Sequence, residues 1–390
     1  MLLVTGGAGY IGTHVTRSLI SGGRDVVVVD DLSAGHPELL PAGVPVEVGS
    51  VLDTDFLMDV IDMYDVEGVV HLAGRKAVDE SITRPSYYYR QNVYGMQSVL
   101  AAMVRLRVRR IVFSSSAAVY GAVGDDTVTE DAPTLPQSPY GRSKLMCEWL
   151  LRDIAAAEGM SWSALRYFNV AGAGDKDLAD RGIHNLVPRV FQAIDRGEAP
   201  SVFGDTYDTP DGTCIRDYIH VTDLAAAHAT VVDAMDTAPM AAVYNVGCGC
   251  GASVLDVMRA ARQASGVPFD WQIDEPRAVI RHEWSPTPPG SRGTRLEGTA
   301  RPGRHRRQRV GSMVDVEVGH DDGVETGRCT RGGSPLDPSG FPPSESARVI
   351  FVIARAGAFT CACSNMWKME TCIPLHDVVA RLGRCSCSAR

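Results

Sequence analysis

Short hydrophobic runs recur along the first two-thirds of the chain. Leu2–Thr5 stops at a group of glycines, and a valine-rich run over residues 25–29 stops at Asp30. Further strand candidates follow at 46–48, 68–71 and 110–114. An uninterrupted apolar run of this length is typical of a strand that is buried on both faces. Because helical stretches separate the runs, the pattern predicts a Rossmann-like, doubly wound parallel α/β sheet.

The pattern changes in the second half of the chain. Residues 164–170 predict another strand, and residues 244–247 predict a late one. From about Gly172 the periodicity loosens into loops and short helices, as in a substrate-binding insertion. We therefore expect a Rossmann domain at 1–171, to which some later segments return, and a smaller substrate-binding domain at 172–277.

A glycine-rich turn follows the first predicted strand and precedes a predicted helix at about 11–20. Its glycines are Gly6, Gly7, Gly9 and Gly12. Their spacing satisfies both G-x-G-x-x-G and G-x-x-G-x-x-G, which allow a tight turn and let backbone N–H groups approach a pyrophosphate at the helix N-terminus. Asp30 lies where a carboxylate accepts from the adenosine ribose hydroxyls, which favours NAD over NADP.

Polar and small residues collect at the ends of three later strands. They are Leu72, Ala73, Gly74 and Lys76, then Asn92, then Ser114–Ser116. Ligands of a doubly wound sheet bind at the carboxyl ends of its strands, so these residues are candidates for dinucleotide contacts. Lys76 fits equally well as a solvated surface lysine.

Tyr140 and Lys144 are four residues apart, and in a helix they lie on one face, one turn apart. An ammonium group beside a phenol lowers the phenol pKa from about 10, so that the phenolate can act as a general base toward a hydroxyl group. Alone, the pair also fits an ordinary surface helix; the glycine turn and the strand pattern favour the catalytic interpretation. Further along, Arg216 suits a phosphate, whereas His220 fits a structural hydrogen bond better than catalysis.

Composition limits the remaining options. The 390 residues are 45% hydrophobic and 22% charged, and the net charge of −9 argues against general binding to nucleic acid or anionic membranes. No stretch is long enough for a membrane span, and the N-terminus lacks the features of a signal peptide, so we expect a cytoplasmic protein. The ten cysteines show no zinc-ligand spacing, and no metal site is predicted.

Seven segments together resemble one family. They are TGGAGYIG at 5–12, HLAGRKAVDES at 71–81, SSSAAVYG at 114–121, PQSPYGRSKLMCE at 136–148, LRYFNVAGA at 165–173, DGTCIRDYIHV at 211–221 and YNVG at 244–247. The joint pattern resembles the extended short-chain dehydrogenase/reductase superfamily and, within it, the UDP-glucose 4-epimerase family. The resemblance covers about residues 1–277.

The resemblance implies roles for individual residues. Tyr140 would be the catalytic base, Lys144 would lower its pKa and hold the nicotinamide ribose, and Ser116 would bridge Tyr140 and the sugar. The implied UDP-sugar contacts are Ser116, Tyr140, Asn169, Asn185, Leu186, Phe203, Arg216 and Arg277. The implied NAD contacts are Gly6, Gly7, Gly9, Tyr10, Ile11, Gly12, Asp30, Asp31, Ser50, Val51, Leu72, Ala73, Gly74, Lys76, Asn92, Tyr140, Lys144 and Phe168. Asp31 and Ser50 depart from the family, which usually has Asn at the first position and often Asp at the second.

The implied reaction interconverts UDP-glucose and UDP-galactose, a step of galactose metabolism. The sugar is oxidised at C4 by bound NAD and then reduced again on its opposite face. A nucleotide-sugar dehydratase needs an acid/base pair after the hydroxyl residue, and Ala117-Ala118 cannot supply one. A catalytically silent NAD(H)-binding protein is the alternative from another class. The family commonly forms homodimers.

The family pattern stops at Pro276-Arg277. Codons for residues 278–288, read one base out of step, can encode Gly-Asp-Pro-Ala-Arg-Val-Val-Ala-Asp-Ala-Ser, the continuation expected of the family. We therefore interpret 278–390 as a frameshifted, disordered tail, with a novel C-terminal domain as the alternative. The substrate-binding domain would then be incomplete, and UDP-sugar binding would be weakened.

Overall fold

The computed structural model describes residues 1–122, 128–249 and 251–276. The predictions for Arg277 and for the tail at 278–390 lie outside these residues. All that follows concerns the described part of the chain.

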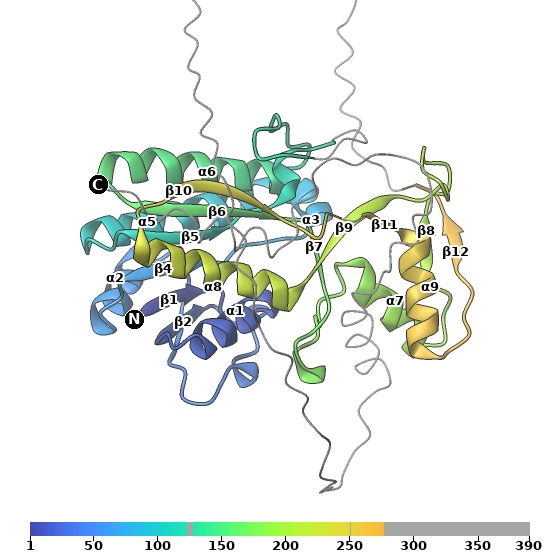
Figure 1. Cartoon of the computed structure of the whole chain (residues 1–390), viewed down its shortest axis with the longest axis horizontal. Helices are drawn as coiled ribbons and strands as arrows, with labels where there is room; N and C mark the ends of the chain where they lie inside the picture. Colours follow the sequence, from blue (N-terminus) through green and yellow to red (C-terminus); the bar gives the residue numbers. More distant parts are fainter. Residues whose placement is uncertain (123–127, 250, 277–390) are drawn as a thin grey trace, which may run out of the picture. The chain divides into compact units, whose positions relative to one another are not determined.

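A seven-stranded sheet in which every neighbouring pair is parallel forms the centre of the fold (Figure 1). In spatial order its strands are β10 (Ala241–Val246), β6 (Ser161–Tyr167), β5 (Arg110–Ser114), β4 (Gly68–His71), β1 (Leu2–Thr5), β2 (Val26–Asp30) and β3 (Val46–Val48). The order 3-2-1-4-5-6 followed by β10 is that of a doubly wound Rossmann sheet. The predicted fold class is confirmed.

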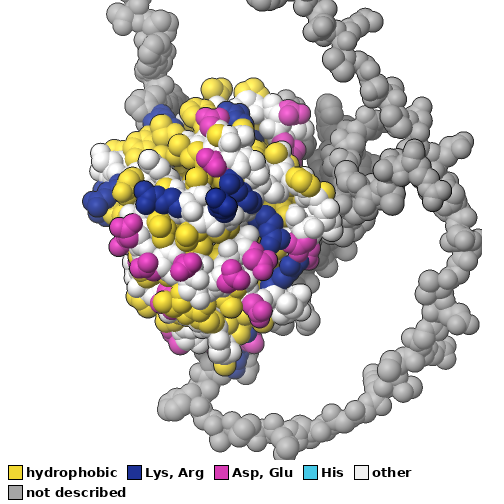
Figure 2. Space-filling model, turned by 90° about the vertical axis from the view of Figure 1, so that its left-hand side faces the viewer, with side chains coloured by type: hydrophobic (Ala, Val, Ile, Leu, Met, Phe, Trp, Pro, Cys, Tyr) yellow, Lys and Arg dark blue, Asp and Glu magenta, His cyan; other side chains and the backbone are white. Residues whose placement is uncertain are grey.

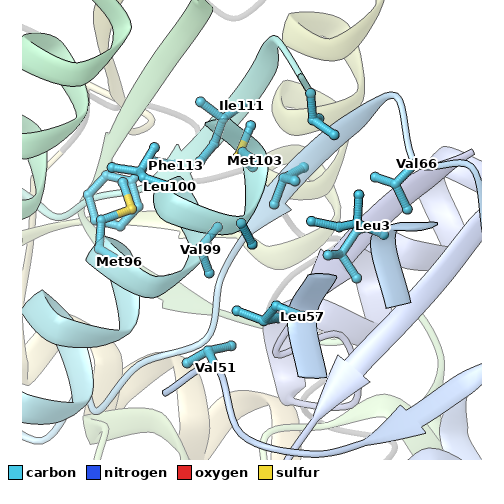
Figure 3. Close-up of a cluster of buried hydrophobic side chains, with 14 of the residues drawn as sticks. Leu3, Val51, Leu57, Val66, Met96, Val99, Leu100, Met103, Ile111 and Phe113 are labelled. Carbon is cyan, nitrogen blue, oxygen red and sulfur yellow. The ribbon is translucent and has the colours of Figure 1, made fainter. Parts of the chain in front are cut away.

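Helices cover both faces of this sheet. The covering helices are α1 (Tyr10–Ser21), α2 (Thr54–Met63), α5 (Gly95–Arg105), α6 (Pro139–Glu158) and α8 (Val221–Thr237). Side chains of α2, α5 and α6 share one core cluster with the strands, which includes Leu57, Met96, Leu100 and Phe113 (Figure 3). Helices α1 and α8 pack on each other and contribute Val15 and other side chains to a second cluster. Burial on both faces explains why the inner strands β1, β2 and β4 are mostly apolar runs.

Short helices connect several of these elements. They are η1 (Pro37–Leu39), α3 (Val78–Thr83), α4 (Pro85–Tyr88), the π-helix η2 (Tyr89–Tyr94), η3 (Ala117–Val119) and η4 (Lys176–Leu178).

A smaller group of elements has its own core. It contains α7 (Leu186–Asp195), β8 (Ser201–Phe203), α9 (Val254–Ser265) and β12 (Gln272–Asp274), packed around residues such as Phe191 and Met258. A separate three-stranded sheet joins β7 (Asn169–Ala171), β9 (Ile215–His220) and β11 (Gly251–Ser253). Helix α8 and strand β10 come later in the chain than 171, yet both belong with the large sheet. The boundary at 171/172 stays a prediction.

The single strand expected at 164–170 is two strands in the structure. Tyr167 ends β6 opposite Val246 of β10, whereas Asn169 begins β7 opposite Tyr218 of β9. The chain therefore leaves one sheet and enters another at Phe168. The sequence pattern does not separate the two strands, because only one residue lies between them.

The surface carries both signs of charge. In Figure 2 a band of Lys and Arg side chains lies beside Asp and Glu side chains on one face. Among the described residues, no helix combines the length and the apolar character that crossing a membrane would require.

Three histidines are buried within the large sheet and its covering helices, and His71 and His228 are buried more deeply than His14. His71, 1% exposed, shares a hydrogen bond of 2.7 Å with the Thr5 hydroxyl, and His228 is fully buried with the Ser114 hydroxyl 2.8 Å from its Nε2. Burial lowers the pKa of His71 to about 3 and that of His228 to about 4, because the charged imidazolium would lose its hydration.

These histidines should make the protein less stable in mild acid. Below about pH 6.5 the unfolded chain binds protons that the folded chain excludes, so stability is complete above that pH and falls toward pH 4. Each such histidine contributes a slope of about 1.4 kcal/mol per pH unit. Urea unfolding between pH 5 and 7 measures the slope. His228→Gln should reduce it and the exposed His184→Gln should not; equal slopes in the wild type and His228→Gln would contradict the prediction.

Candidate active site

A cavity of about 460 Å³ opens at the carboxyl ends of strands β1, β2 and β4. Every residue predicted to contact NAD lines it, except Gly7, Asn92 and Phe168. Tyr140 and Lys144 of helix α6 line the same cavity. The fold thus brings the glycine turn and the Tyr–Lys pair, which are more than a hundred residues apart in sequence, to one hollow. Ligand sites of doubly wound sheets lie at this edge.

In the glycine turn at the start of α1, neighbouring backbone atoms leave no space for a side chain at Gly6 or Gly12. Gly6 has φ +70°, and a Cβ placed on Gly12 would lie 2.1 Å from the Gly6 carbonyl oxygen. Helix α1 begins after Gly9 with no side-chain cap and no acidic residue in its first turn. Its N-terminal N–H groups therefore remain available to an anionic group such as a pyrophosphate, and the turn fits NAD.

Asp30 lies at the end of β2, on the wall of the cavity. Its carboxylate accepts from the backbone N–H of Ala8 at 3.1 Å and of Leu32 at 2.9 Å, which fixes its orientation. Both oxygens keep a further lone pair for ribose hydroxyls. Asp31 follows, 3.7 Å from the guanidinium of Arg75. Two carboxylates at this end of the cavity disfavour the extra phosphate of NADP.

Asp30→Ala should weaken NAD binding about 10- to 100-fold, because a hydrogen bond to a charged group contributes ~1.5–3 kcal/mol. It should also narrow the preference for NAD over NADP. Fluorescence titration with each reduced dinucleotide measures both effects. Asp25→Ala is the matched control, since Asp25 is exposed and does not line the cavity. Unchanged NAD affinity in Asp30→Ala would place the adenosine ribose elsewhere.

Asn92 supports the cavity without lining it. It is buried in the π-helix, where its Oδ1 accepts from Arg75 N at 2.8 Å and its Nδ2 donates to the Ser143 hydroxyl at 2.8 Å. It thereby ties the loop after β4 to helix α6. Gly74 allows this approach, because a Cβ there would lie 3.0 Å from Asn92 Oδ1. Single-turn π-helices often occur at functional sites.

Ser116, Tyr140 and Lys144 form a buried group, each at most 8% exposed. Ser138 caps helix α6 by accepting from Gly141 N, so the helix begins with Pro139 and Tyr140 comes next. The Ser116 hydroxyl acts to lower the pKa of the Tyr140 phenol, and Lys144 Nζ donates to the Ser114 carbonyl at 2.8 Å. A phenol, a hydroxyl and an amine therefore converge where β5 ends and α6 begins.

The pKa of Tyr140 differs from the expectation that Lys144 lowers it. Burial raises the phenol pKa, and only the hydrogen bond from Ser116 opposes that effect. Burial also lowers the pKa of Lys144 to about 8. The physical reason is that removal from water penalises both charged forms, while the Lys144 amine is directed to the Ser114 carbonyl.

The cavity is also lined by residues that the sequence analysis did not include, and Tyr167 and Asp180 are two of them. Tyr167 lies beside Tyr140, and burial raises its pKa. The sequence pattern could have indicated Tyr167, because it is the last residue of a strand that ends at the cavity. Asp180 holds the Asn185 amide at 2.9 Å and lies 3.8 Å from Lys76 Nζ. It belongs to a loop, and no spacing in the sequence relates it to either partner.

Of the residues expected to bind the UDP-sugar, Tyr140 lines the cavity. The others in the described part of the chain come from several elements and do not line it. Asn169 begins β7, next to β9, which carries Arg216. Asn185 precedes α7, Leu186 is its first residue, and Phe203 ends β8. Arg216 is exposed, and its guanidinium donates to the Ile215 carbonyl at 2.7 Å. Among the described residues there is no cluster of side chains suited to a metal ion.

Comparison with known proteins gives a consistent result. The NAD dependent epimerase/dehydratase family matches residues 2–247. A UDP-glucose 4-epimerase of Azospirillum brasilense is 46% identical over 269 residues, which cover 68% of this chain and 77% of that protein.

Solved structures agree with this. The UDP-glucose 4-epimerase of Brucella ovis in complex with NAD is 39% identical, with a TM-score of 0.67 and coverage of 71% of this chain and 86% of that one. The enzyme of Bifidobacterium longum, in complex with NAD⁺ and UDP, is 39% identical with a TM-score of 0.66 and the same coverage.

Proposed function

This chain belongs to the NAD dependent epimerase/dehydratase family, and from that premise we propose that it interconverts UDP-glucose and UDP-galactose with bound NAD. The observation that supports this most strongly is the position of Tyr140 and Lys144 in the cavity lined by the glycine turn. A base and a dinucleotide site then face the same sugar carbon. Relatives named UDP-glucose 4-epimerase give the substrate class.

The mechanism assigns a task to each side chain. Bound NAD supplies the acceptor and donor of hydride for C4 of the sugar. Tyr140 removes the proton of the 4-hydroxyl as C4 is oxidised and returns it when the 4-keto sugar is reduced on the other face. Ser116 hydrogen-bonds the phenol and stabilises its charged form. Lys144 holds the nicotinamide ribose, and Asp30 holds the adenosine ribose.

The UDP part of the substrate would be held outside the dinucleotide cavity. We assign this task to Asn169, Asn185, Leu186, Phe203 and Arg216. Arg216 is exposed on β9 and can turn its guanidinium to a diphosphate. The relative from Bifidobacterium longum was solved in complex with NAD⁺ and UDP, which supports a UDP site in addition to the dinucleotide site.

An assay with UDP-galactose on the full chain tests the proposal, with UDP-glucose measured by a coupled dehydrogenase. We expect turnover together with transient absorbance of reduced nicotinamide. A protein that binds NAD but gives neither signal would be the silent NAD(H)-binding alternative.

Self-association through α6 is a further part of the proposal. Met146 and Trp149 on this helix are 39% and 48% exposed, although both are large and apolar. Apolar side chains on a helix beside the site suit a homodimer interface. Light scattering during size-exclusion chromatography measures the oligomeric state.

A further inference from the structure

A buried ion pair lies behind the proposed catalytic group. Glu148 of α6 and Arg166 of β6 are joined twice, by Nε to Oε1 at 3.0 Å and by NH2 to Oε2 at 2.6 Å. Their side chains are only 5% and 7% exposed. Neither residue lines the cavity, so the pair has no direct contact with a ligand there.

The pair holds both ends of the segment that carries Ser116. Ser115 Oγ donates to Glu148 Oε1 at 2.5 Å. At the other end, Arg166 NH1 donates to the Tyr120 hydroxyl at 2.8 Å. Ser116 lies between these two attachments, at the start of the short helix η3.

Strand β10 secures the second attachment. The Tyr120 hydroxyl donates to Asn245 Oδ1 at 2.7 Å, and Asn245 Nδ2 donates to the Val128 carbonyl at 2.9 Å. The backbone of Asn245 pairs with that of Arg166 across the two strands. The segment around Ser116 is therefore attached to the large sheet by the hydrogen bonds of Tyr120 with Arg166 and Asn245.

The same helix that supplies Glu148 also presents Tyr140. Glu148 lies two turns after Tyr140 and one turn after Lys144. Near the start of the helix, a Cβ on Gly141 would lie 2.5 Å from the Ala118 carbonyl oxygen, so α6 directly contacts η3 there. The distance between the Ser116 and Tyr140 hydroxyls is thus determined by two contacts between one helix and one segment.

A contribution to folding stability does not by itself explain the buried ion pair of Glu148 and Arg166. Desolvating two charges costs about as much as their attraction returns, and well-packed apolar residues often replace buried pairs without loss. Directional hydrogen bonds, in contrast, fix positions that apolar contacts leave free. A misplacement of about 1 Å can lower a catalysed rate about a hundredfold.

We propose that Glu148 and Arg166 are positioning residues, which hold the segment of Ser116 in place relative to the Tyr140 phenol. The proposal deepens the epimerase function above and rests on it. Without the pair, Ser116 would lose its fixed distance to the phenol, and the phenolate would lose its stabilising hydrogen bond.

Ser115→Ala is the sharpest variant, because it releases the segment from Glu148 but leaves Arg166 paired. Ser163→Ala is its matched control: Ser163 is equally buried on β6, and its hydroxyl has no hydrogen-bond partner among the described residues. We expect Ser115→Ala to lower kcat for UDP-galactose about tenfold, with KM within about twofold and a melting temperature close to that of the control. Tyr120→Phe should act in the same direction from the other end.

A second readout does not depend on turnover. Carbon-13 NMR of the tyrosine Cζ reports the titration of Tyr140, assigned by the resonance missing in Tyr140→Phe. In Ser115→Ala the phenol should titrate at higher pH than in the wild type, because the hydrogen bond that lowers its pKa is weakened.

If Ser115→Ala matches Ser163→Ala in both kcat and phenol titration, the positioning role is wrong. An inactive wild type would refute the epimerase function, whereas the titration would still test the positioning role.

Discussion

Replacing Tyr140 by phenylalanine should lower kcat for UDP-galactose about a thousandfold, within the range that a general base contributes. The change removes one hydroxyl and leaves the ring, which is 7% exposed and packed where β5 meets α6. Bound NAD should remain, because the glycine turn and Asp30 are unaffected. The coupled epimerase assay measures the rate, and acid release measures the NAD content.

Tyr64→Phe is the control for this experiment. Tyr64 also loses a hydrogen-bonded hydroxyl, its 2.6 Å bond to Glu47, but it does not line the cavity. Its activity should equal that of the wild type. Equal activity in Tyr140→Phe would remove Tyr140 from the mechanism.

Gly12→Ala should weaken NAD binding about a hundredfold. The new Cβ would lie 2.1 Å from the Gly6 carbonyl oxygen and 2.7 Å from Gly7 Cα, and neither backbone atom can rotate away. Helix α1 must then shift from the turn that it closes, at a cost of ~1–3 kcal/mol for overpacking. The NAD content of the purified protein and titration with NADH measure the loss.

Gly22→Ala at the other end of α1 is the matched control. Gly22 has a negative φ of −80°, and its nearest neighbour would be 3.3 Å from the added Cβ. It should retain NAD. Full NAD content in Gly12→Ala would show that the dinucleotide does not bind at the glycine turn.

The large sheet could be predicted because its inner strands are buried on both faces. Such strands appear in sequence as apolar runs, and the runs at Leu2–Thr5 and Gly68–His71 match β1 and β4 at both ends. The glycine turn could be predicted equally well, because the spacing of its glycines follows from the close contact between Gly12 and Gly6. Local rules govern these features.

Other features depend on contacts between distant residues. The raised pKa of Tyr140 follows from burial and from the direction of the Lys144 amine, and spacing four residues apart reports neither. The same holds for Asp180, whose partners are Lys76 and Asn185. The break between β6 and β7 arises because Tyr167 pairs with a strand of the large sheet, whereas Asn169 pairs with a strand of the three-stranded sheet.

Strand β10 has a consequence for synthesis on the ribosome. It completes the large sheet by pairing with β6, yet it is translated after the whole insertion between them. Until residue 246 leaves the exit tunnel, the nascent protein displays the open edge of β6, whose backbone groups can recruit a strand from another molecule. A message that stops before that codon should therefore yield inclusion bodies.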